Sequence, residues 1–213
     1  MTITSTPHRS TALDGPPAGR RTMVTLAVIY LGFFGFLMAS GADREPDADP
    51  SKLIADYNVS ATVIQVVTYS TVVAGVVLIF FGAALRSALV VRTRRWTADV
   101  AFLGFVLMAL TLVTWAISAL ALYHAVDIGD VGVVRAINVI DTTNFPLAML
   151  SMSCAMVAVG VTALREQALP TWLSWATIAL GVMSPLGPLA FAPFLLFAIW
   201  TVVLAATVRL SET

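Results

Sequence analysis

The chain has 213 residues, of which 59% are hydrophobic and only 11% are charged, and its formal net charge at pH 7 is zero. Charged residues make up about a quarter of an average soluble domain, and the helices of a soluble bundle need polar faces, so this composition excludes that class. A chain without excess positive charge also lacks the basic footprint of a nucleic-acid-binding protein.

Six apolar segments are predicted to form membrane-crossing helices, since one crossing needs about 20 apolar residues. The clearest sign is the stretch from Gln167 to Val208, which contains no charged residue and has the turn sequence Pro185-Leu186-Gly187-Pro188 near its middle. That stretch is expected to hold two spans. The six spans are predicted at about 23–40, 59–85, 98–123, 139–164, 171–184 and 189–208. We therefore expect an all-α membrane protein with six transmembrane helices in a single domain, 23–210.

The segments outside the spans have their own patterns. Residues 1–22 are rich in Thr, Pro, Gly and Arg without periodicity, which predicts a disordered cytoplasmic tail, and 211–213 form a second short tail. Asp49 followed by Pro50 is typical of a helix start. A short helix is therefore expected at about 50–58, lying at the outer interface and leading into the second span.

The basic residues orient the spans. Nine of the twelve fall before the first span, in the second and fourth connections or after the last span: Arg9, Arg20, Arg21, Arg86, Arg92, Arg94, Arg95, Arg165 and Arg209. The opposite side has Arg44, Lys52 and Arg135, together with most of the acidic residues. The positive-inside rule then places both termini in the cytoplasm of a multi-pass protein in the cell membrane.

The first span has an alternative interpretation. Arg20-Arg21 before the apolar run and Ala39-Ser40-Gly41-Ala42 after it resemble a cleaved secretion signal. Cleavage would leave five spans. The length of the run and its aromatic residues favour an uncleaved anchor.

Three motifs carry a resemblance to known proteins. The first is Leu164-Arg165-Glu166-Gln167-Ala168-Leu169-Pro170-Thr171-Trp172-Leu173-Ser174-Trp175, an arginine followed by Leu-Pro-x-Trp-Leu-x-Trp at the inner mouth of the fifth span. The others are Ala55-Asp56-Tyr57 and Phe81-Gly82-Ala83-Ala84-Leu85-Arg86. With these motifs the chain resembles uncharacterised six-helix integral membrane proteins of actinobacteria, which are similar to a larger bacterial membrane family of unknown function. The resemblance covers about 23–210 and implies the architecture without an active site.

Several kinds of catalytic site are excluded by residue counts. The two histidines, His8 and His124, are not placed to hold a haem within the spans, and the single Cys154 permits neither an intrachain disulfide nor a CxxC motif. The only lysine, Lys52, lies in a connection, so a retinal Schiff base inside a helix is excluded. The hydrolase and nucleotide-binding signatures HExxH, GxSxG and the phosphate-binding loop do not occur. We expect no cofactor, no metal site and no catalytic residue.

Polar side chains gather in the outer halves of the second, third and fourth spans. A charged or amide group in hydrocarbon costs about 2.5–3.5 kcal/mol on insertion scales, so these side chains are expected to converge. Two interpretations stay open: hydrogen bonds that serve helix packing, or an outward-facing pocket for a small ligand, ion or lipid headgroup. Asp141 can also lie at headgroup depth. The candidate pocket residues are Gln65, Tyr69, Trp115, Ser118, Asn138, Asp141 and Asn144.

A second candidate site lies on the inner surface, where basic residues precede Trp96. Each such residue contributes about 1 kcal/mol against anionic lipid, so lipid contact and topology suffice to explain them, and a protein-partner site is the alternative. The candidate lipid contacts are Arg86, Arg92, Arg94 and Arg95.

Two functions are compatible with this sequence. The first is a non-enzymatic integral membrane protein that scaffolds, senses or regulates, with membrane lipids as its partners. The second is a small transporter or channel that uses the polar pocket between the second, third and fourth spans. Broken helices would favour transport, and only Pro146 and the region from Pro185 to Pro193 indicate them.

Overall fold

The computed structural model describes residues 19–39, 49–57, 61–90 and 95–208, and its regular structure in these ranges is entirely helical. The predicted all-α class is confirmed. Five helices are long and apolar enough to cross a membrane, whereas the predicted fifth span forms a shorter helix. The elements are α1 (Arg20–Ala39), α2 (Pro50–Tyr57), α3 (Ala61–Val90), α4 (Arg95–Ile128), α5 (Val131–Glu166), α6 (Thr171–Met183), the 3-10 helix η1 (Gly187–Ala190) and α7 (Phe191–Thr207). The two predicted tails lie outside these ranges apart from 19–22, and the prediction of disorder is wrong for Arg20 to Thr22, which form the first turn of α1.

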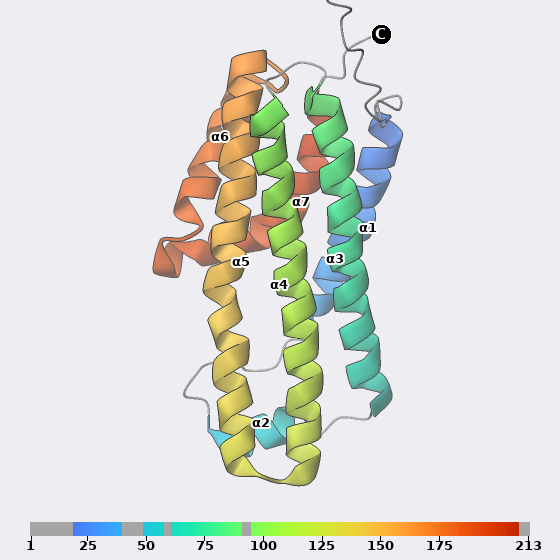
Figure 1. Cartoon of the computed structure of the whole chain (residues 1–213), viewed down its shortest axis with the longest axis vertical. Helices are drawn as coiled ribbons and strands as arrows, with labels where there is room; N and C mark the ends of the chain where they lie inside the picture. Colours follow the sequence, from blue (N-terminus) through green and yellow to red (C-terminus); the bar gives the residue numbers. More distant parts are fainter. Residues whose placement is uncertain (1–18, 40–48, 58–60, 91–94, 209–213) are drawn as a thin grey trace, which may run out of the picture.

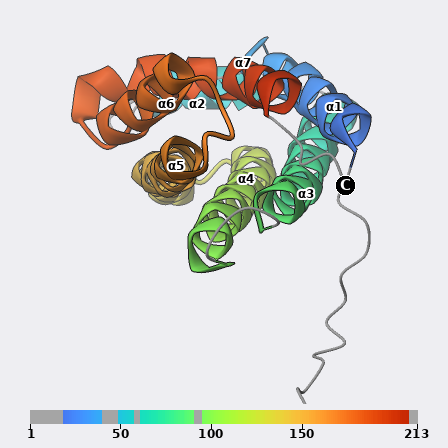
Figure 2. The ribbon, with the colours of Figure 1, turned by 90° about the horizontal axis from the view of Figure 1, so that it is seen from above.

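The long helices are arranged in two layers (Figures 1 and 2). Seen from above, α3, α4 and α5 form one layer, and α1, α7 and α6 form the other. Consecutive neighbours make the main contacts, since α4 packs on both α3 and α5, α6 packs on α5, and α1 packs on both α3 and α7. The six helices therefore enclose one interior.

Glycines allow the helices to approach closely. A Cβ at Gly104 of α4 would lie 2.5 Å from the backbone nitrogen of Ala155 on α5, and one at Gly160 of α5 would lie 3.0 Å from the carbonyl oxygen of Ser174 on α6. Helices in lipid gain no hydrophobic free energy from associating, so close van der Waals packing at small residues stabilises them instead. These glycines therefore fix how α4, α5 and α6 pack.

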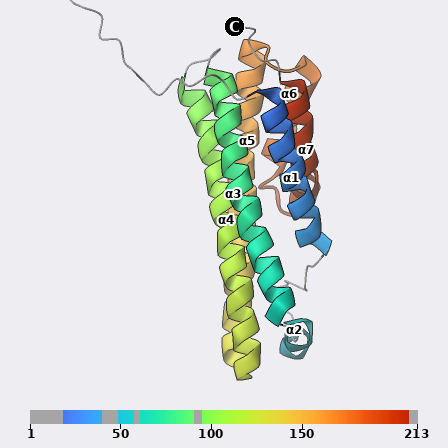
Figure 3. The same cartoon turned by 90° about the vertical axis from the view of Figure 1, so that its right-hand side faces the viewer.

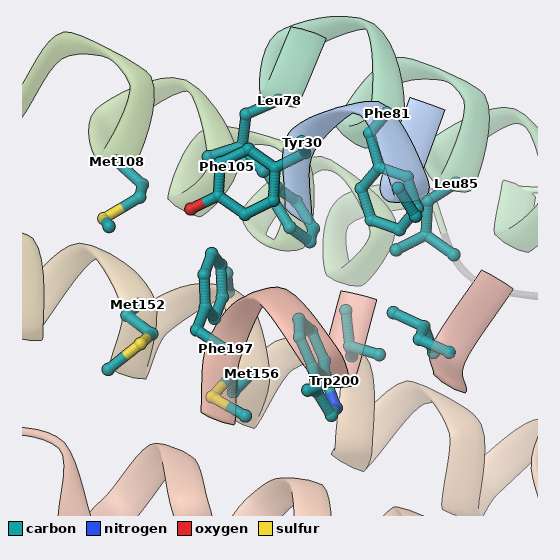
Figure 4. Close-up of a cluster of buried hydrophobic side chains, with 14 of the residues drawn as sticks. Tyr30, Leu78, Phe81, Leu85, Phe105, Met108, Met152, Met156, Phe197 and Trp200 are labelled. Atoms are coloured by element: carbon teal, nitrogen blue, oxygen red, sulfur yellow. The ribbon is translucent and has the colours of Figure 1, made fainter. Parts of the chain in front are cut away.

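The interior contains aromatic and methionine side chains from five helices, together with many alanines and leucines (Figure 4). Phe105 of α4 lies at its centre, with its ring centroid 5.4 Å from that of Phe81 and 6.2 Å from those of Phe197 and Trp200. Tyr30 of α1 contacts Phe197 edge to face at 6.2 Å. The packing of α1 and α7 onto the other helices therefore depends on this cluster.

The helices α4 and α5 continue well beyond the predicted spans. Residues 124–138, expected to form a connection, are helical apart from a turn around Gly129, whose φ is +78°. Asp130 ends the turn and caps α5, because its carboxylate accepts from the backbone N–H groups of Gly132 and Val133 at 2.8 and 3.2 Å. The spans were predicted from apolar residues alone, so they ended where polar residues begin. A helix that is capped and packs on a neighbour can continue through such polar sequence.

A short helix lies across the projecting ends of α4 and α5, at the position expected for the outer helix (Figures 1 and 3). This is α2, which contacts both of them. Asp49 caps it, accepting from the backbone N–H and the hydroxyl of Ser51, both at 2.9 Å. These two bonds lower the pKa of the Asp49 carboxyl group, the backbone bond most. Proline in the first turn and an acidic cap thus start this helix as predicted.

Candidate functional site

Five of the seven polar residues proposed to form a pocket are buried near the α2 end of the bundle. Asp141 is only 1% exposed and Asn138 is 2% exposed, and the remaining three are also buried: Trp115, Ser118 and Asn144. The indole Nε1 of Trp115 donates a hydrogen bond of 3.2 Å to the backbone carbonyl oxygen of Asp141, which links α4 to α5. Trp115 and Asp141 are thus in contact, and Asn138 and Asn144 are buried on α5 together with Asp141.

Gln65 and Tyr69 do not join this cluster, and the expectation that they would is wrong. Both are exposed on α3, Tyr69 to 69%. The face of α3 that packs inward carries Val67 and Thr71 instead, and the Thr71 hydroxyl bonds to the Val67 carbonyl oxygen at 2.8 Å. Helical spacing shows which residues share a face, but it does not show which face is covered.

The depth of the cluster follows from helix geometry. Glu166, at the C-terminal end of α5, and Asn144 are separated by about 33 Å at 1.5 Å per residue, which is close to the thickness of the hydrocarbon core. A bilayer with one boundary at Glu166 would have its other boundary near Asn144. Asp141 and Asn138 would then lie at headgroup depth, the third interpretation considered for Asp141.

The cluster is suited to holding α4 and α5 together. Its side chains are enclosed, and the amide nitrogen Nδ2 of Asn144 has no hydrogen-bond partner among the described residues. In the part of the chain that the structure describes, no group of three or more His, Cys, Asp or Glu side chains could hold a metal ion. Among the described residues, the hydrogen bond of Trp115 to the Asp141 carbonyl oxygen joins α4 to α5 within this cluster.

A groove that the sequence analysis missed lies between α1 and α3. It has a volume of about 460 Å³ and is lined by Val28, Ile29, Gly32, Phe33, Phe36, Val66 and Ser70. A Cβ added at Gly32 would meet no atom within 4 Å, so this glycine leaves open space rather than allowing a close helix contact. Gly32 was the only sign of this groove in the sequence. A glycine that lines a groove cannot be distinguished in sequence from a glycine at a close contact between helices.

The four arginines proposed as lipid contacts are only partly described. Arg86 of α3 pairs with Asp99 of α4, its Nε lying 2.6 Å from Oδ1, and both side chains are a little under half exposed. Arg92 and Arg94 lie outside the described residues, as does the side chain of Arg95. The sequence analysis missed Asp99 as a partner of Arg86, because the two residues lie on different helices.

Comparison with known proteins finds no matching family model, no matching curated protein and no matching solved structure. The resemblance to six-helix actinobacterial membrane proteins therefore stays an expectation, and no residue role is taken from it.

Proposed function

We propose that this chain is a non-enzymatic multi-pass protein of a bacterial plasma membrane that binds a membrane lipid in the groove between α1 and α3. The groove carries this proposal. Its volume of about 460 Å³ falls in the range of small-molecule sites, about 300–1,000 Å³. Scaffolding, sensing or regulation by the bundle would then depend on which lipid is bound.

The walls of the groove match an acyl chain better than a polar solute. Five of the seven lining residues are Val, Ile or Phe, and Ser70 contributes a hydroxyl group. Val28, Phe36 and Val66 are about half exposed, so they face outward from the bundle. An apolar groove at the edge of a membrane protein is open to the lipid phase, and a bound chain gains dispersion contacts there.

Filling the groove should remove the bound lipid. Leucine in place of Gly32 extends into the space that the glycine leaves open, so Gly32→Leu is expected to lose lipids that the wild-type protein retains through mild detergent. Native mass spectrometry of the two purified proteins measures this directly.

Gly35→Leu is the matched control. Gly35 lies on the same helix and its Cβ position is equally open, but it does not line the groove. The control should retain lipid as the wild type does. Equal lipid retention in Gly32→Leu and the wild type would contradict the proposal.

Transport is less well supported than lipid binding. The helix α5 continues through Pro146 without a break, so one of the two regions that indicated discontinuous helices is a continuous helix. The side chains of the polar cluster are buried, and Gln65 and Tyr69 lie outside it.

Both termini are proposed to be cytoplasmic, on the strength of the arginine distribution. Arg20 and Val208 lie at one end of the bundle, where the Arg20 guanidinium donates to the Val208 carbonyl oxygen at 3.2 Å, and α2 lies at the other (Figure 1). In a Cys154→Ala background, Asp127→Cys is expected to react with a membrane-impermeant maleimide in intact cells. Thr171→Cys is expected to react only in inverted vesicles. The reverse labelling pattern would overturn this orientation.

A further inference from the structure

We infer that the groove between α1 and α3 takes an ester-linked glycerolipid from the leaflet at the α2 end of the bundle. The ester region lies beside Ser70, and an acyl chain runs along α1 toward Val28. The leaflet, the direction of the chain and the polar contact extend the lipid binding proposed above and rest on it. In the proposed orientation this leaflet is the outer one.

Exposed tryptophans mark one membrane boundary. Trp96 at the start of α4 and Trp172 and Trp175 at the start of α6 are all more than half exposed. Tryptophan is enriched at membrane–water interfaces, where its ring lies at headgroup level. Trp115 lies about 28 Å along α4 from Trp96, and the hydrocarbon core is about 30 Å thick. The second boundary would therefore lie near Trp115.

The mouth of the groove lies at the level of this second boundary. Helices α3 and α4 run in opposite directions side by side (Figure 1), and a Cβ at Gly75 would lie 3.1 Å from the carbonyl oxygen of Ala109. Ser70 precedes Gly75 by five residues and Trp115 follows Ala109 by six, so Ser70 and Trp115 lie at the same level. Among the described lining residues, Ser70 has the polar side chain.

The apolar wall of the groove extends from this boundary into the membrane. The ring of Phe194 on α7 lies 6.1 Å from that of Trp115 and 5.3 Å from that of Phe34 on α1, so Phe34 lies close to the level of Trp115. Val28 is six residues, or about 9 Å, nearer to the start of α1. Half of the hydrocarbon core is about 15 Å thick. The groove thus lies within one leaflet, with its hydroxyl group on the headgroup side.

The Ser70 hydroxyl group suits the ester region of a lipid. The hydroxyls of Thr71 and Ser87 on the same helix bond to carbonyl oxygens of α3 at 2.8 and 2.7 Å, whereas Ser70 has no hydrogen bond among the described residues. A serine hydroxyl donates one hydrogen bond, and the ester carbonyl oxygens at the edge of the hydrocarbon accept. An ether-linked chain has no carbonyl oxygen at this place, so the contact distinguishes the two lipid classes.

Competition between two lipids tests the polar contact. The purified protein is mixed in mild detergent with equal amounts of a diacyl phosphatidylcholine and its dialkyl ether analogue, and native mass spectrometry measures each bound species. The wild type should bind the ester lipid about three to ten times more than the ether lipid, the worth of one hydrogen bond. Ser70→Ala should bind both equally. Ser87→Ala, at the other end of α3, is the matched control and should keep the preference.

The two levels of the proposal fail separately in this competition. Equal binding of both lipids by the wild type, or an unchanged preference in Ser70→Ala, would overturn the ester contact even where Gly32→Leu loses its lipid. Equal lipid retention by Gly32→Leu and the wild type would instead contradict binding in the groove itself.

Photoreactive lipids test the leaflet and the direction of the chain. In vesicles that contain the wild-type protein, a lipid with a diazirine beside its ester should label Val66 and Ser70. A lipid with the diazirine at the end of its chain should label Val28 and Ile29, and peptide mass spectrometry locates both products. Both signals should disappear in Gly32→Leu. Labelling of Val28 by the ester probe and of Ser70 by the chain-end probe would place the lipid in the opposite leaflet and overturn the inference.

Discussion

Phe105→Ala is expected to reduce the free energy of unfolding more than any other single truncation in the interior, by about 3–5 kcal/mol. The Phe105 side chain is fully buried, and its ring contacts rings from α3 and α7. Removing it leaves a cavity that three helices cannot close without moving. Because membrane helices associate by packing rather than by leaving water, the lost contacts account for most of this effect.

The matched control is Phe80→Ala on α3. Phe80 is 61% exposed and faces away from the interior, so its removal should change stability by less than about 0.5 kcal/mol. Reversible unfolding of both variants in mixed micelles with increasing sodium dodecyl sulfate measures the difference. Similar losses in the two variants would show that the cluster around Phe105 does not hold the bundle together.

Gly104→Ala is expected to destabilise the contact between α4 and α5 by about 1–3 kcal/mol, although alanine is the better helix former. The added methyl group would lie 2.5 Å from the backbone nitrogen of Ala155 and 2.7 Å from its Cα. Backbone atoms cannot rotate away as a side chain does, so the two helices must separate along their length. The apparent melting temperature in detergent should fall accordingly.

Gly35→Ala tests whether this effect comes from packing. The new methyl group meets no atom within 4 Å, so stability should stay the same or rise slightly through helix propensity. A loss in Gly35→Ala as large as that in Gly104→Ala would assign the effect to glycine itself rather than to the approach of α5.

Hydropathy was sufficient to predict where the helices lie, since all six spans correspond to helices. It was not sufficient to predict where α4 and α5 end, because their projecting turns are stabilised by the Asp130 cap and by mutual packing rather than by apolar composition. It also assigned a full span to α6. The thirteen residues of α6 extend over only about 20 Å, which is less than the thickness of the hydrocarbon core.

The candidate site was predictable to the extent that polar residues recur on one helix. Asn138, Asp141 and Asn144 share a face of α5, and that face is buried. Gln65 and Tyr69 share a face of α3 by the same rule, and that face is exposed. The difference depends on which neighbours each helix has, and single-sequence periodicity carries no information about neighbours. The groove beside Gly32 was not predicted for the same reason, because it is lined by residues of two helices, α1 and α3.

The contact between α1 and α7 also determines when the bundle can be completed during biosynthesis. The helix α1, which is made before the other described helices, packs Tyr30 and Phe34 against Phe197 and Phe194 of α7. Until α7 has left the translocon, these aromatic rings can be covered only by lipid or by a transient chaperone. Membrane insertion of α1 and closure of the interior are therefore separate events, in agreement with two-stage assembly. A ribosome stalled before Phe191 would release a protein that has α1, α3, α4, α5 and α6 but an open core.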